Sequence, residues 1–457
     1  MSVTAARSER AVYGAEGDAE ALQSAFVGGE IPVAVYGLGK MGLPLAAVFA
    51  DVTGNVVGVD IDESVVAAIE SGDSPVDGEP GLDALVAETT ADGALSATTR
   101  SAQAAEAAQL HVVIVPTLIE DGEPDLSMLL AAVDAIADGL SPGDLVVVES
   151  TVPPGTTRDV VAPRLADRSG LDGEEFGLAV CPERTASGRA IQDIRGAYPK
   201  VVGGLDGESG RVAGLLYDAL TDNEVIDAGD ATTAECVKVF EGIYRDVNIA
   251  LANELARVAD PLDVDVTRAI EVANTQPFCE IHDPGPGVGG HCIPLYPQFL
   301  TATVDTDLPL IETGRSVNDR MPSFVADAVV DLLSDHGVPV ADADILVLGV
   351  AYRAGVDETR ESPTRPLVAV LDALGADVWA ADPAVDVAAV SDLPAEPLSV
   401  DDAEATASRY DAVVVMTAHE RYRDIDFGAF DDAVAVDARA ALDDISLPRY
   451  TVGAGRK

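Results

Sequence analysis

The chain has 457 residues, and its 79 acidic against 28 basic side chains give it a net charge of −51 at pH 7. This length is too great for one hydrophobic core and predicts two or three domains. A negative field of this strength repels nucleic acid and anionic lipid, so we exclude both nucleic acid and membranes as partners.

The acidic residues are spread through every segment of the chain, whereas lysine is rare. The lysines are Lys40, Lys200, Lys238 and Lys457. A composition with many dispersed acidic residues and little lysine resembles that of proteins from a salt-rich cytosol. There, high ionic strength shortens the Debye length and screens the repulsion among the acidic side chains. We therefore expect a halophilic protein, in which a retained lysine is informative.

Cysteine usage and hydropathy indicate the compartment. The cysteines, Cys181, Cys236, Cys279 and Cys292, lack the spacing of a disulfide framework, so we expect free thiols in a reducing environment. No basic-then-apolar signal opens the sequence, and no apolar run is long enough to span a bilayer. The sequence thus predicts a soluble, cytoplasmic protein.

The first half of the chain predicts alternating strands and helices. After a polar extension over residues 1–30 with a short helix, residues 31–50 predict a strand, a glycine turn and a helix, and residues 55–62 a strand ending in acid. Further short apolar runs predict buried parallel strands at 110–117, 144–151 and 176–183. This alternation is typical of a doubly wound sheet.

A different period begins at Ala231. Apolar residues recur every three or four positions and predict a long amphipathic helix with one buried stripe. The stripe consists of Val237, Phe240, Tyr244, Val247, Leu251, Leu255 and Val258. A second alternating region follows, with predicted strands in 344–352, 376–383 and 410–420.

These patterns predict an α/β fold class: two Rossmann-like doubly wound domains joined by a helical central domain with a long helix. We place the first Rossmann-like domain at 31–225, the central domain at 226–325 and the second Rossmann-like domain at 326–457.

The glycine turn predicts a dinucleotide site. Gly37, Gly39 and Gly42 match G-x-G-x-x-G between a strand and a helix, and Asp60 ends the next strand at the offset of a ribose-binding acid. The glycines would let a pyrophosphate reach the helix N-terminus. An acid repels a 2′-phosphate, so NAD is favoured over NADP. The alternative is a tight turn with a solvated Asp60.

Two further features point to catalysis. Lys238, Glu241, Arg245 and Asn248 share one face of the long helix. A solvated face is the usual meaning of such a pattern, but the scarcity of lysine favours a role for Lys238 in stabilising an oxyanion. Glu183 follows a strand at the carboxyl edge of the sheet, where ligands bind, although a plain surface glutamate is an even alternative.

The segment PGPGVGGHCIP, residues 284–294, presents Cys292 after a glycine-rich loop. The thiol could be a nucleophile, a metal ligand or a small core residue. A zinc site would combine Cys279, His282, His291 and Cys292. We expect no metal, because adjacent residues of an extended segment point in opposite directions and no second C-x-x-C pair exists. The other cysteines are expected to be structural.

Seven motifs occur in one order along the chain: GLGKMGLPLA, ESTVPPGTT, CPERTASGRAI, KVFEGIYRDVNIALANELA, GPGVGGHCIP, RSVNDRMP and LGVAYRAGVDETRESP. In this order they resemble the UDP-glucose/GDP-mannose dehydrogenase family, from about Ile31 to Val452. The motifs CPER, YRDVNIALANE and GVGGHCIP look most like the branch that oxidises UDP-N-acetylhexosamines.

The resemblance implies an enzyme that oxidises a sugar C6 alcohol to a carboxylate with two NAD⁺. It implies that Cys292 holds the aldehyde as a thiohemiacetal and then a thioester, that Lys238 stabilises the oxyanion, and that Glu183 handles protons or water. We expect UDP-N-acetyl-D-mannosamine as substrate, with UDP-N-acetylglucosamine or UDP-glucose as alternatives. Two other classes stay open: a two-electron hydroxy-acid dehydrogenase and a non-catalytic nucleotide-sugar sensor.

The resemblance also implies binding residues. The cofactor contacts would be Gly37, Gly39, Lys40, Met41, Gly42, Asp60, Thr117, Thr151 and Arg360. The sugar-nucleotide contacts would be Arg184, Thr185, Lys238, Arg245, Gly289, Tyr352 and Arg353. The last domain would bind the UDP moiety, and the long helix would form the core of a homodimer.

Some positions depart from the family pattern. Four residues after the helix lysine, many relatives carry Asn where this chain has Gly242. Four residues after the cysteine, many carry Asp where this chain has Tyr296. Many also carry Lys at the position of Arg353. The segment NTQPFCEIHDP, residues 274–284, has no arginine, although relatives often place one there to reach the neighbouring subunit's substrate.

Overall fold

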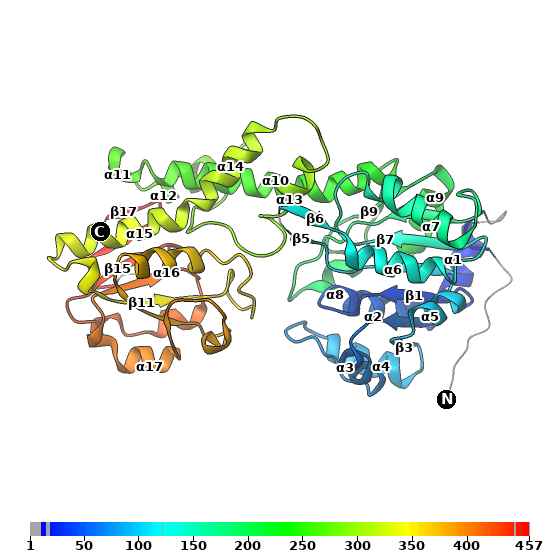
Figure 1. Ribbon diagram of the computed structural model, residues 1–457, viewed down its shortest axis with the longest axis horizontal. Helices are drawn as coiled ribbons and strands as arrows, with labels where there is room; N and C mark the ends of the chain where they lie inside the picture. Colours follow the sequence, from blue (N-terminus) through cyan, green and yellow to red (C-terminus); the bar gives the residue numbers. More distant parts are fainter. Residues whose placement is uncertain (1–10, 15–18, 121, 443–444, 457) are drawn as a thin grey trace. The chain divides into compact units, whose positions relative to one another are not determined.

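The computed structural model describes residues 11–14, 19–120, 122–442 and 445–456 (Figure 1). The chain forms two compact units. The N-terminal unit comprises residues 1–240 and 298–305, and the C-terminal unit comprises residues 241–297 and 306–457.

An eight-stranded sheet forms the centre of the N-terminal unit, in the order β10-β9-β8-β7-β4-β1-β2-β3. Its strands are β1 (Val33–Tyr36), β2 (Val56–Val59), β3 (Leu95–Thr98), β4 (Leu110–Val113), β7 (Leu145–Val148), β8 (Gly177–Val180), β9 (Lys200–Gly204) and β10 (Val225–Asp227). All neighbouring strands run parallel except β8 and β9. After β1 the chain continues to β2 on one side of the sheet order, and after β4 it continues to β7 on the other side. The carboxyl ends of β1 and β4 therefore form the switch point at which ligands of such folds bind.

Helices cover both faces of this sheet, because successive strand residues point to opposite sides. Val33 and Val35 belong to one buried cluster, which includes Phe49, whereas Ala34 and Tyr36 belong to another. The α-helices are α1 (Ala19–Val27), α2 (Gly42–Thr53), α3 (Glu63–Glu70), α4 (Leu82–Ala91), α5 (Ser101–Ala107), α6 (Ser127–Ala137), α7 (Ala162–Ser169), α8 (Ala190–Gln192) and α9 (Gly207–Asp218). A hairpin of β5 (Leu118–Glu120) and β6 (Glu123–Asp125) follows β4.

The C-terminal unit contains a seven-stranded sheet in the order β13-β12-β11-β14-β15-β16-β17. Its strands are β11 (Asp344–Leu348), β12 (Asp377–Ala381), β13 (Glu396–Leu398), β14 (Ala412–Val415), β15 (Val434–Asp437), β16 (Arg449–Thr451) and β17 (Gly455–Arg456). Only the last pair, β16 and β17, is antiparallel among these described strands. Its helices include α11 (Ala259–Leu262), α12 (Val266–Ala273), α14 (Pro309–Asp319), α15 (Met321–Asp335), α16 (Thr364–Ala373) and α17 (Val400–Ala405).

The chain passes between the units at three points: within α10 (Ala231–Ala256), within α13 (Tyr296–Thr301) and between residues 305 and 306. The predicted fold class, with two Rossmann-like regions and a helical middle, is confirmed. Among the helices of the described ranges, none combines the length and the apolar character needed to cross a membrane.

The long helix α10 is confirmed, but its predicted buried stripe is wrong at four of its seven positions, Phe240, Tyr244, Leu251 and Val258, which are exposed. Phe240, Tyr244 and Leu251 are 52%, 50% and 48% exposed. The buried positions of the helix include Val239, Ile243, Asp246, Ala250 and Asn253. This chain covers the predicted face only in part, at residues such as Val237 and Leu255, because a polar network around Asp246 and Asn253 holds a different face inside the C-terminal unit.

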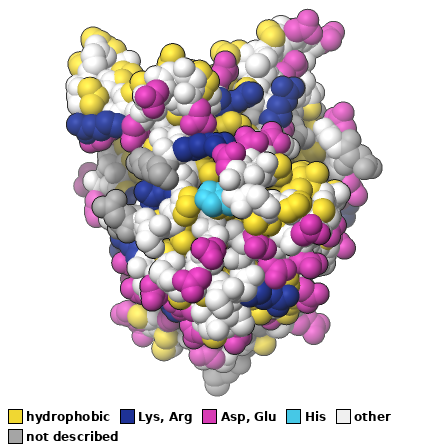
Figure 2. All heavy atoms as spheres, turned by 90° about the vertical axis from the view of Figure 1, so that its left-hand side faces the viewer, with side chains coloured by type: hydrophobic (Ala, Val, Ile, Leu, Met, Phe, Trp, Pro, Cys, Tyr) yellow, Lys and Arg dark blue, Asp and Glu magenta, His cyan; other side chains and the backbone are white. Residues whose placement is uncertain are grey.

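The acidic side chains are dispersed over the surface as expected. On the face drawn in Figure 2, Asp and Glu side chains lie among apolar and uncharged atoms across the whole view and do not gather in one patch. On this face the repulsion among acidic residues is therefore distributed and not concentrated in one patch.

Candidate active site

The glycine turn after β1 leaves space at one of its three glycines. A Cβ on Gly37, whose φ is +97°, would lie 2.3 Å from the Ile114 carbonyl oxygen, and a Cβ on Gly42 would lie 1.9 Å from the Gly37 carbonyl oxygen. These two glycines are required by the packing of the chain itself. No atom lies within 4 Å of the Cβ position on Gly39, so this residue leaves the room that a pyrophosphate needs.

Asp60 is tied to the same turn. One carboxylate oxygen accepts a hydrogen bond from the Leu38 amide at 2.8 Å, and the other accepts from the Asp62 amide at 3.0 Å. These bonds fix the carboxylate at the end of β2 beside the glycine turn. The remaining lone pairs of its oxygens suit the hydroxyl donors of a ribose.

Thr117 and Thr151 come together although 34 residues separate them. The Thr117 hydroxyl donates to the Thr151 carbonyl at 2.5 Å. The Ser150 hydroxyl accepts from the Val115 amide at 2.8 Å, which also joins the loops after β4 and β7. The glycine turn, Asp60 and these two loops lie at one edge of the sheet and fit a dinucleotide such as NAD.

The predicted catalytic lysine and glutamate form an ion pair. The Lys238 ammonium lies 3.5 Å from a carboxylate oxygen of Glu183, and their side chains are only 12% and 16% exposed. Glu183 follows β8, and its amide donates to the Glu149 carbonyl at 3.3 Å. A partly desolvated ammonium beside a carboxylate can stabilise an oxyanion and exchange a proton within one site.

The loop after β8 also contacts the cofactor turn. The Thr185 hydroxyl donates to the Met41 sulfur at 3.0 Å, and the Thr185 amide donates to the Glu183 carboxylate. Met41 is a predicted cofactor contact and Thr185 a predicted sugar-nucleotide contact. Their direct contact places the Lys238–Glu183 pair on the same side of the sheet as the glycine turn.

Two residues that the sequence analysis did not identify hold this loop. Tyr198 donates its hydroxyl to the Arg184 carbonyl, and the Arg184 guanidinium lies 5.4 Å from the centre of the Tyr198 ring. Burial raises the pKa of Tyr198, so its hydroxyl stays a donor. Glu79 is buried and accepts from the Gly188 and Ala190 amides at 2.5 and 3.0 Å.

A buried polar cluster behind Glu183 was also missed. Tyr217 donates its hydroxyl to the Glu149 carboxylate, and the Lys200 ammonium lies 5.8 Å from the centre of the Tyr217 ring. Burial raises the pKa of Glu149, whereas Lys200 opposes that rise. Burial also acts against the charged form of Lys200, but the combined attraction of Glu149, Cys181 and Glu183 outweighs it and raises the pKa of Lys200. The scarcity of lysine was the signal that could have identified Lys200.

Cys181 adjoins this cluster and is fully buried. Burial raises the pKa of its thiol, with a further rise from Glu149. A thiol that stays protonated is inert, which agrees with the structural role predicted for Cys181.

In the C-terminal unit, the glycines of the Cys292 loop serve the packing of the chain. The Gly290 amide donates to the Arg360 carbonyl at 2.9 Å, and a Cβ on Gly290 would lie 3.0 Å from the Tyr352 ring. A Cβ on Gly289 would lie 2.7 Å from both the Tyr352 Cβ and the Glu361 carbonyl oxygen. The loop therefore needs glycine in order to lie against the segment that follows β11.

His291 and Cys292 interact directly. A hydrogen bond with the Cys292 side chain is the main cause that raises the pKa of His291. The expectation that adjacent His and Cys side chains point apart was wrong, because this segment turns and is not extended. Cys292 itself is partly exposed and carries no disulfide, so the thiol is accessible beside an imidazole.

Tyr352, a predicted sugar-nucleotide contact, is influenced by the charge of Cys292 and by two other predicted contacts. Burial raises the pKa of Tyr352, with a smaller rise from Cys292, while Arg353 and Arg245 oppose the change. In the C-terminal unit, Tyr352 is thus within electrostatic range of Cys292, Arg353 and Arg245. Arg360, predicted as a cofactor contact, belongs to the same unit, where its guanidinium lies 3.7 Å from the Glu358 carboxylate.

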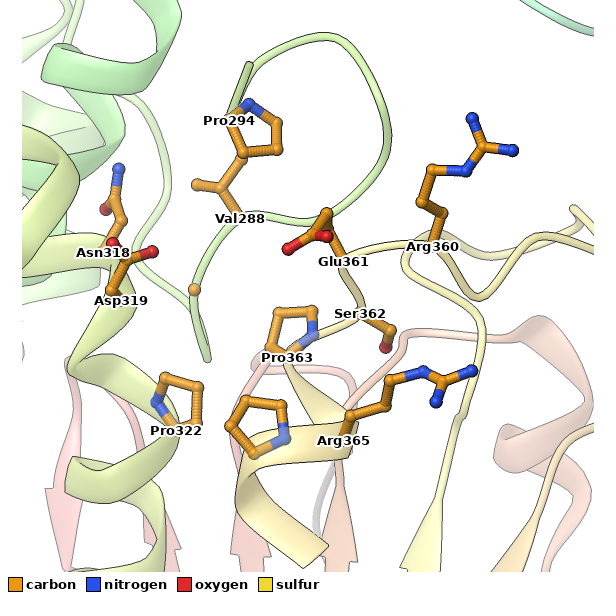
Figure 3. Close-up of a pocket in the computed structure, with 12 residues that line it drawn as sticks. Val288, Pro294, Asn318, Asp319, Pro322, Arg360, Glu361, Ser362, Pro363 and Arg365 are labelled. Carbon is orange, nitrogen blue, oxygen red and sulfur yellow. The ribbon is translucent and has the colours of Figure 1, made fainter. Parts of the chain in front are cut away.

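A cleft of about 460 Å³ borders the Cys292 loop (Figure 3). Val288 and Pro294 line one side, and residues 360–363, 365 and 366 line the other. The carboxylates of Asp319 and Glu361 turn toward the cleft, whereas the side chains of Arg360 and Arg365 lead away from it. The lining of the cleft thus combines two carboxylates with two arginines.

Comparison with known proteins identifies the family. Residues 31–221, 232–320 and 346–444 match the NAD binding, central and UDP binding domains of the UDP-glucose/GDP-mannose dehydrogenase family. The chain belongs to this family. As a member of the UDP-glucose/GDP-mannose dehydrogenases, it is an NAD-dependent nucleotide-sugar dehydrogenase, and the predictions of family, enzyme class and cofactor are confirmed.

Several relatives of this dehydrogenase carry names. The chain is 36% identical over 397 residues to a protein of Pyrococcus horikoshii named UDP-N-acetyl-D-mannosamine dehydrogenase. The matched region covers 86% of this chain and 91% of the Pyrococcus horikoshii protein. A protein of Ralstonia nicotianae named NDP-N-acetyl-D-galactosaminuronic acid dehydrogenase is 37% identical over 419 residues, 89% of this chain and 95% of that one.

Solved structures agree with this relationship. The Pyrococcus horikoshii enzyme matches with a TM-score of 0.86 at 34% identity, over 93% of this chain and 100% of that one. A UDP-glucose dehydrogenase of Pyrobaculum islandicum matches with a TM-score of 0.80 at 27% identity, over 91% of this chain and 95% of that one.

Proposed function

We propose that this dehydrogenase oxidises the C6 alcohol of UDP-N-acetyl-D-mannosamine to the carboxylate, through an intermediate covalently bound to Cys292. The observation that supports the chemistry most directly is the Lys238–Glu183 pair, 3.5 Å apart, in which Glu183 belongs to the loop that contacts the cofactor turn. The choice of sugar rests on the Pyrococcus horikoshii relative. NAD, when bound, accepts one hydride in each of the two oxidation steps.

The protein's side chains have distinct roles in this proposal. Lys238 donates a hydrogen bond to the C6 oxygen as negative charge develops on it. The Cys292 sulfur adds to the aldehyde carbon, and the resulting thiohemiacetal cannot escape before the second oxidation turns it into a thioester. Glu183 takes a proton from the water that attacks the thioester carbon. The carbon–sulfur bond then breaks, which releases the acid and the thiol.

The test is a panel of UDP-sugars with NADH counted per sugar, in buffer of high salt concentration. The panel contains UDP-N-acetyl-D-mannosamine, UDP-N-acetylglucosamine, UDP-N-acetylgalactosamine and UDP-glucose. We expect two NADH per sugar and the highest kcat/KM for UDP-N-acetyl-D-mannosamine. A ratio of one would favour a two-electron dehydrogenase, and no turnover of any acetylated hexosamine would refute the substrate assignment.

The covalent step has its own test. Cys292→Ala should form no acid product, whereas Cys279→Ala, a matched control at another partly exposed cysteine, should keep its activity. Mass spectrometry of the wild-type protein, quenched during turnover, should show the sugar nucleotide attached to the peptide that contains Cys292. Acid formation by Cys292→Ala at the wild-type rate would contradict the covalent route.

A second candidate substrate is UDP-N-acetylgalactosamine, which the Ralstonia nicotianae relative supports through its name. The two sugars differ in stereochemistry at C2 and C4, so their selection depends on the shape of the pocket. A higher kcat/KM for UDP-N-acetylgalactosamine in the same panel would favour this candidate.

We also propose that the protein is a homodimer. Tyr244 and Leu251 expose half of their side chains on α10, and Phe278 is 93% exposed on the neighbouring loop, whose Glu280 carbonyl contacts Tyr244. A second copy would cover these apolar groups. Light scattering should give twice the chain mass, and Leu251→Asp should shift it toward the monomer, whereas the matched α10 control Glu254→Asp should not. A wild-type monomer at micromolar concentration would refute the dimer.

A further inference from the structure

The ring of Tyr296 occupies the space beside Gly242. Gly242 is buried on α10, and a Cβ added to it would lie 1.9 Å from the Tyr296 Cδ2, 2.8 Å from Cε2 and 2.9 Å from Cγ. Real Cβ atoms do not approach other atoms so closely. Any side chain at position 242 would therefore displace the aromatic ring.

Tyr296 is linked closely to the predicted nucleophile. Its side chain is 6% exposed, and its amide donates to the Cys292 carbonyl at 3.1 Å. The Leu295 amide donates to the same carbonyl at 3.1 Å. A single tight turn therefore connects the ring on α10 to the residue that carries the thiol, and a movement of the ring is transmitted to Cys292.

The chain is also held on the other side of Cys292. Two residues earlier, the Gly290 amide is bound to the Arg360 carbonyl. Further upstream, the Gly285 amide donates to the Asn253 side chain at 2.8 Å. Cys292 thus lies between an anchor on the segment after β11 and an anchor on α10, and Tyr296 provides the second anchor.

We propose that Gly242 and Tyr296 form a matched pair in which Tyr296 is a positioning residue that sets the location of the Cys292 thiol. The catalytic significance of this placement rests on the proposed function of Cys292. In this chain position 242 has no side chain, and the ring of Tyr296 fills the space beside it. Position 296 offers no carboxylate, so proton transfer during thioester hydrolysis falls to another group.

The pair is tested by exchanging it for the polar pair. Gly242→Asn should displace the ring and lower kcat about 100-fold, since a displacement of about 1 Å costs on this order, with KM for the UDP-sugar within about threefold. Tyr296→Asp should also lower kcat. The double variant Gly242→Asn/Tyr296→Asp should have a kcat at least about tenfold higher than that of Gly242→Asn. Both single substitutions lower kcat by disturbing the same contact, so their effects are not additive. Additive losses in the double variant would overturn the proposal.

A second measurement keeps the test decisive if Gly242→Asn does not fold. Tyr296→Phe retains the ring, whereas Tyr296→Ala removes it. The rate at which iodoacetamide alkylates Cys292, followed by peptide mass spectrometry without any sugar, should change at least about fivefold in Tyr296→Ala and less than about twofold in Tyr296→Phe. Equal rates in wild type and Tyr296→Ala would overturn the proposal. This rate does not depend on turnover, so it separates failure of the positioning pair from failure of the proposed function.

Discussion

Asn318, near the end of α14, makes three hydrogen bonds inside the C-terminal unit, and its side chain is only 1% exposed. Its amide group donates to the Asp246 carbonyl at 2.9 Å and to the Asp246 carboxylate at 2.8 Å, and its oxygen accepts from Asn253 at 2.9 Å. Asn253 in turn accepts from the Gly285 amide at the start of the Cys292 loop. Asn318→Ala should therefore loosen this loop as well as destabilise the unit.

The magnitude follows from the bonds that are lost. Two bonds between neutral groups contribute about 1 kcal/mol each, and the bond to a carboxylate about 1.5–3 kcal/mol, so Asn318→Ala should lower the free energy of unfolding by about 3–5 kcal/mol. Burial already raises the pKa of Asp246, and Arg315 and Asn318 oppose that rise. Without Asn318 the pKa of Asp246 rises further. The loss should therefore be largest where Asp246 is ionised and shrink as the pH falls through its raised pKa.

Thermal unfolding and amide hydrogen exchange measure the effect. For a unit of 150–250 residues, each kcal/mol shifts Tm by about 2–4 °C, so the C-terminal transition should fall by about 6–20 °C. Exchange in the peptide covering residues 284–290 should accelerate. The matched control is Asn223→Ala in the N-terminal unit, where a partly buried amide bonds the Gly196 carbonyl at 3.0 Å. A loss below about 1 kcal/mol, or unchanged exchange in the loop, would refute the reasoning.

Three further predictions concern charge. Raising KCl from 0.15 to 1 M shortens the Debye length from about 8 to about 3 Å, so Tm should rise, and an unchanged Tm would contradict a halophilic protein. At pH values below the raised pKa of His291, the positive charge of the imidazole should speed alkylation of Cys292. His291→Gln should slow alkylation at these pH values, and the difference from wild type should vanish as the pH rises through that pKa. Equal alkylation rates of the two proteins at all pH values would exclude a role of His291 in activating the thiol. Asp60→Asn should raise KM for NAD⁺ about tenfold and reduce the preference of the enzyme for NAD⁺ over NADP⁺, as measured by initial rates. Unchanged kinetic constants for both cofactors would show that Asp60 is not part of the cofactor site.

Local patterns predicted much of the fold. The strand, glycine turn and helix after residue 31 follow from a short apolar run, three spaced glycines and a second, longer apolar run, and the structure shows β1 and α2 in that place. The strands β3, β9 and β10 were not predicted. β3 has one buried residue and β10 has none, so no clear apolar run marks them, and in the buried strand β9 only two valines stand between a lysine and two glycines. The roles of the individual site residues stay predictions for the variants described above.

The sequence by itself determined the order of elements, the dinucleotide turn, the long helix and the family, because each depends on spacing within a few dozen residues. Only the tertiary structure decided which face of α10 is covered, since a period defines the faces of a helix but not their neighbours. It also decided that Lys238 pairs with Glu183, and that Gly242 receives the Tyr296 ring. Each of these pairs joins segments more than 50 residues apart in the sequence, and their meeting depends on the path of the whole chain.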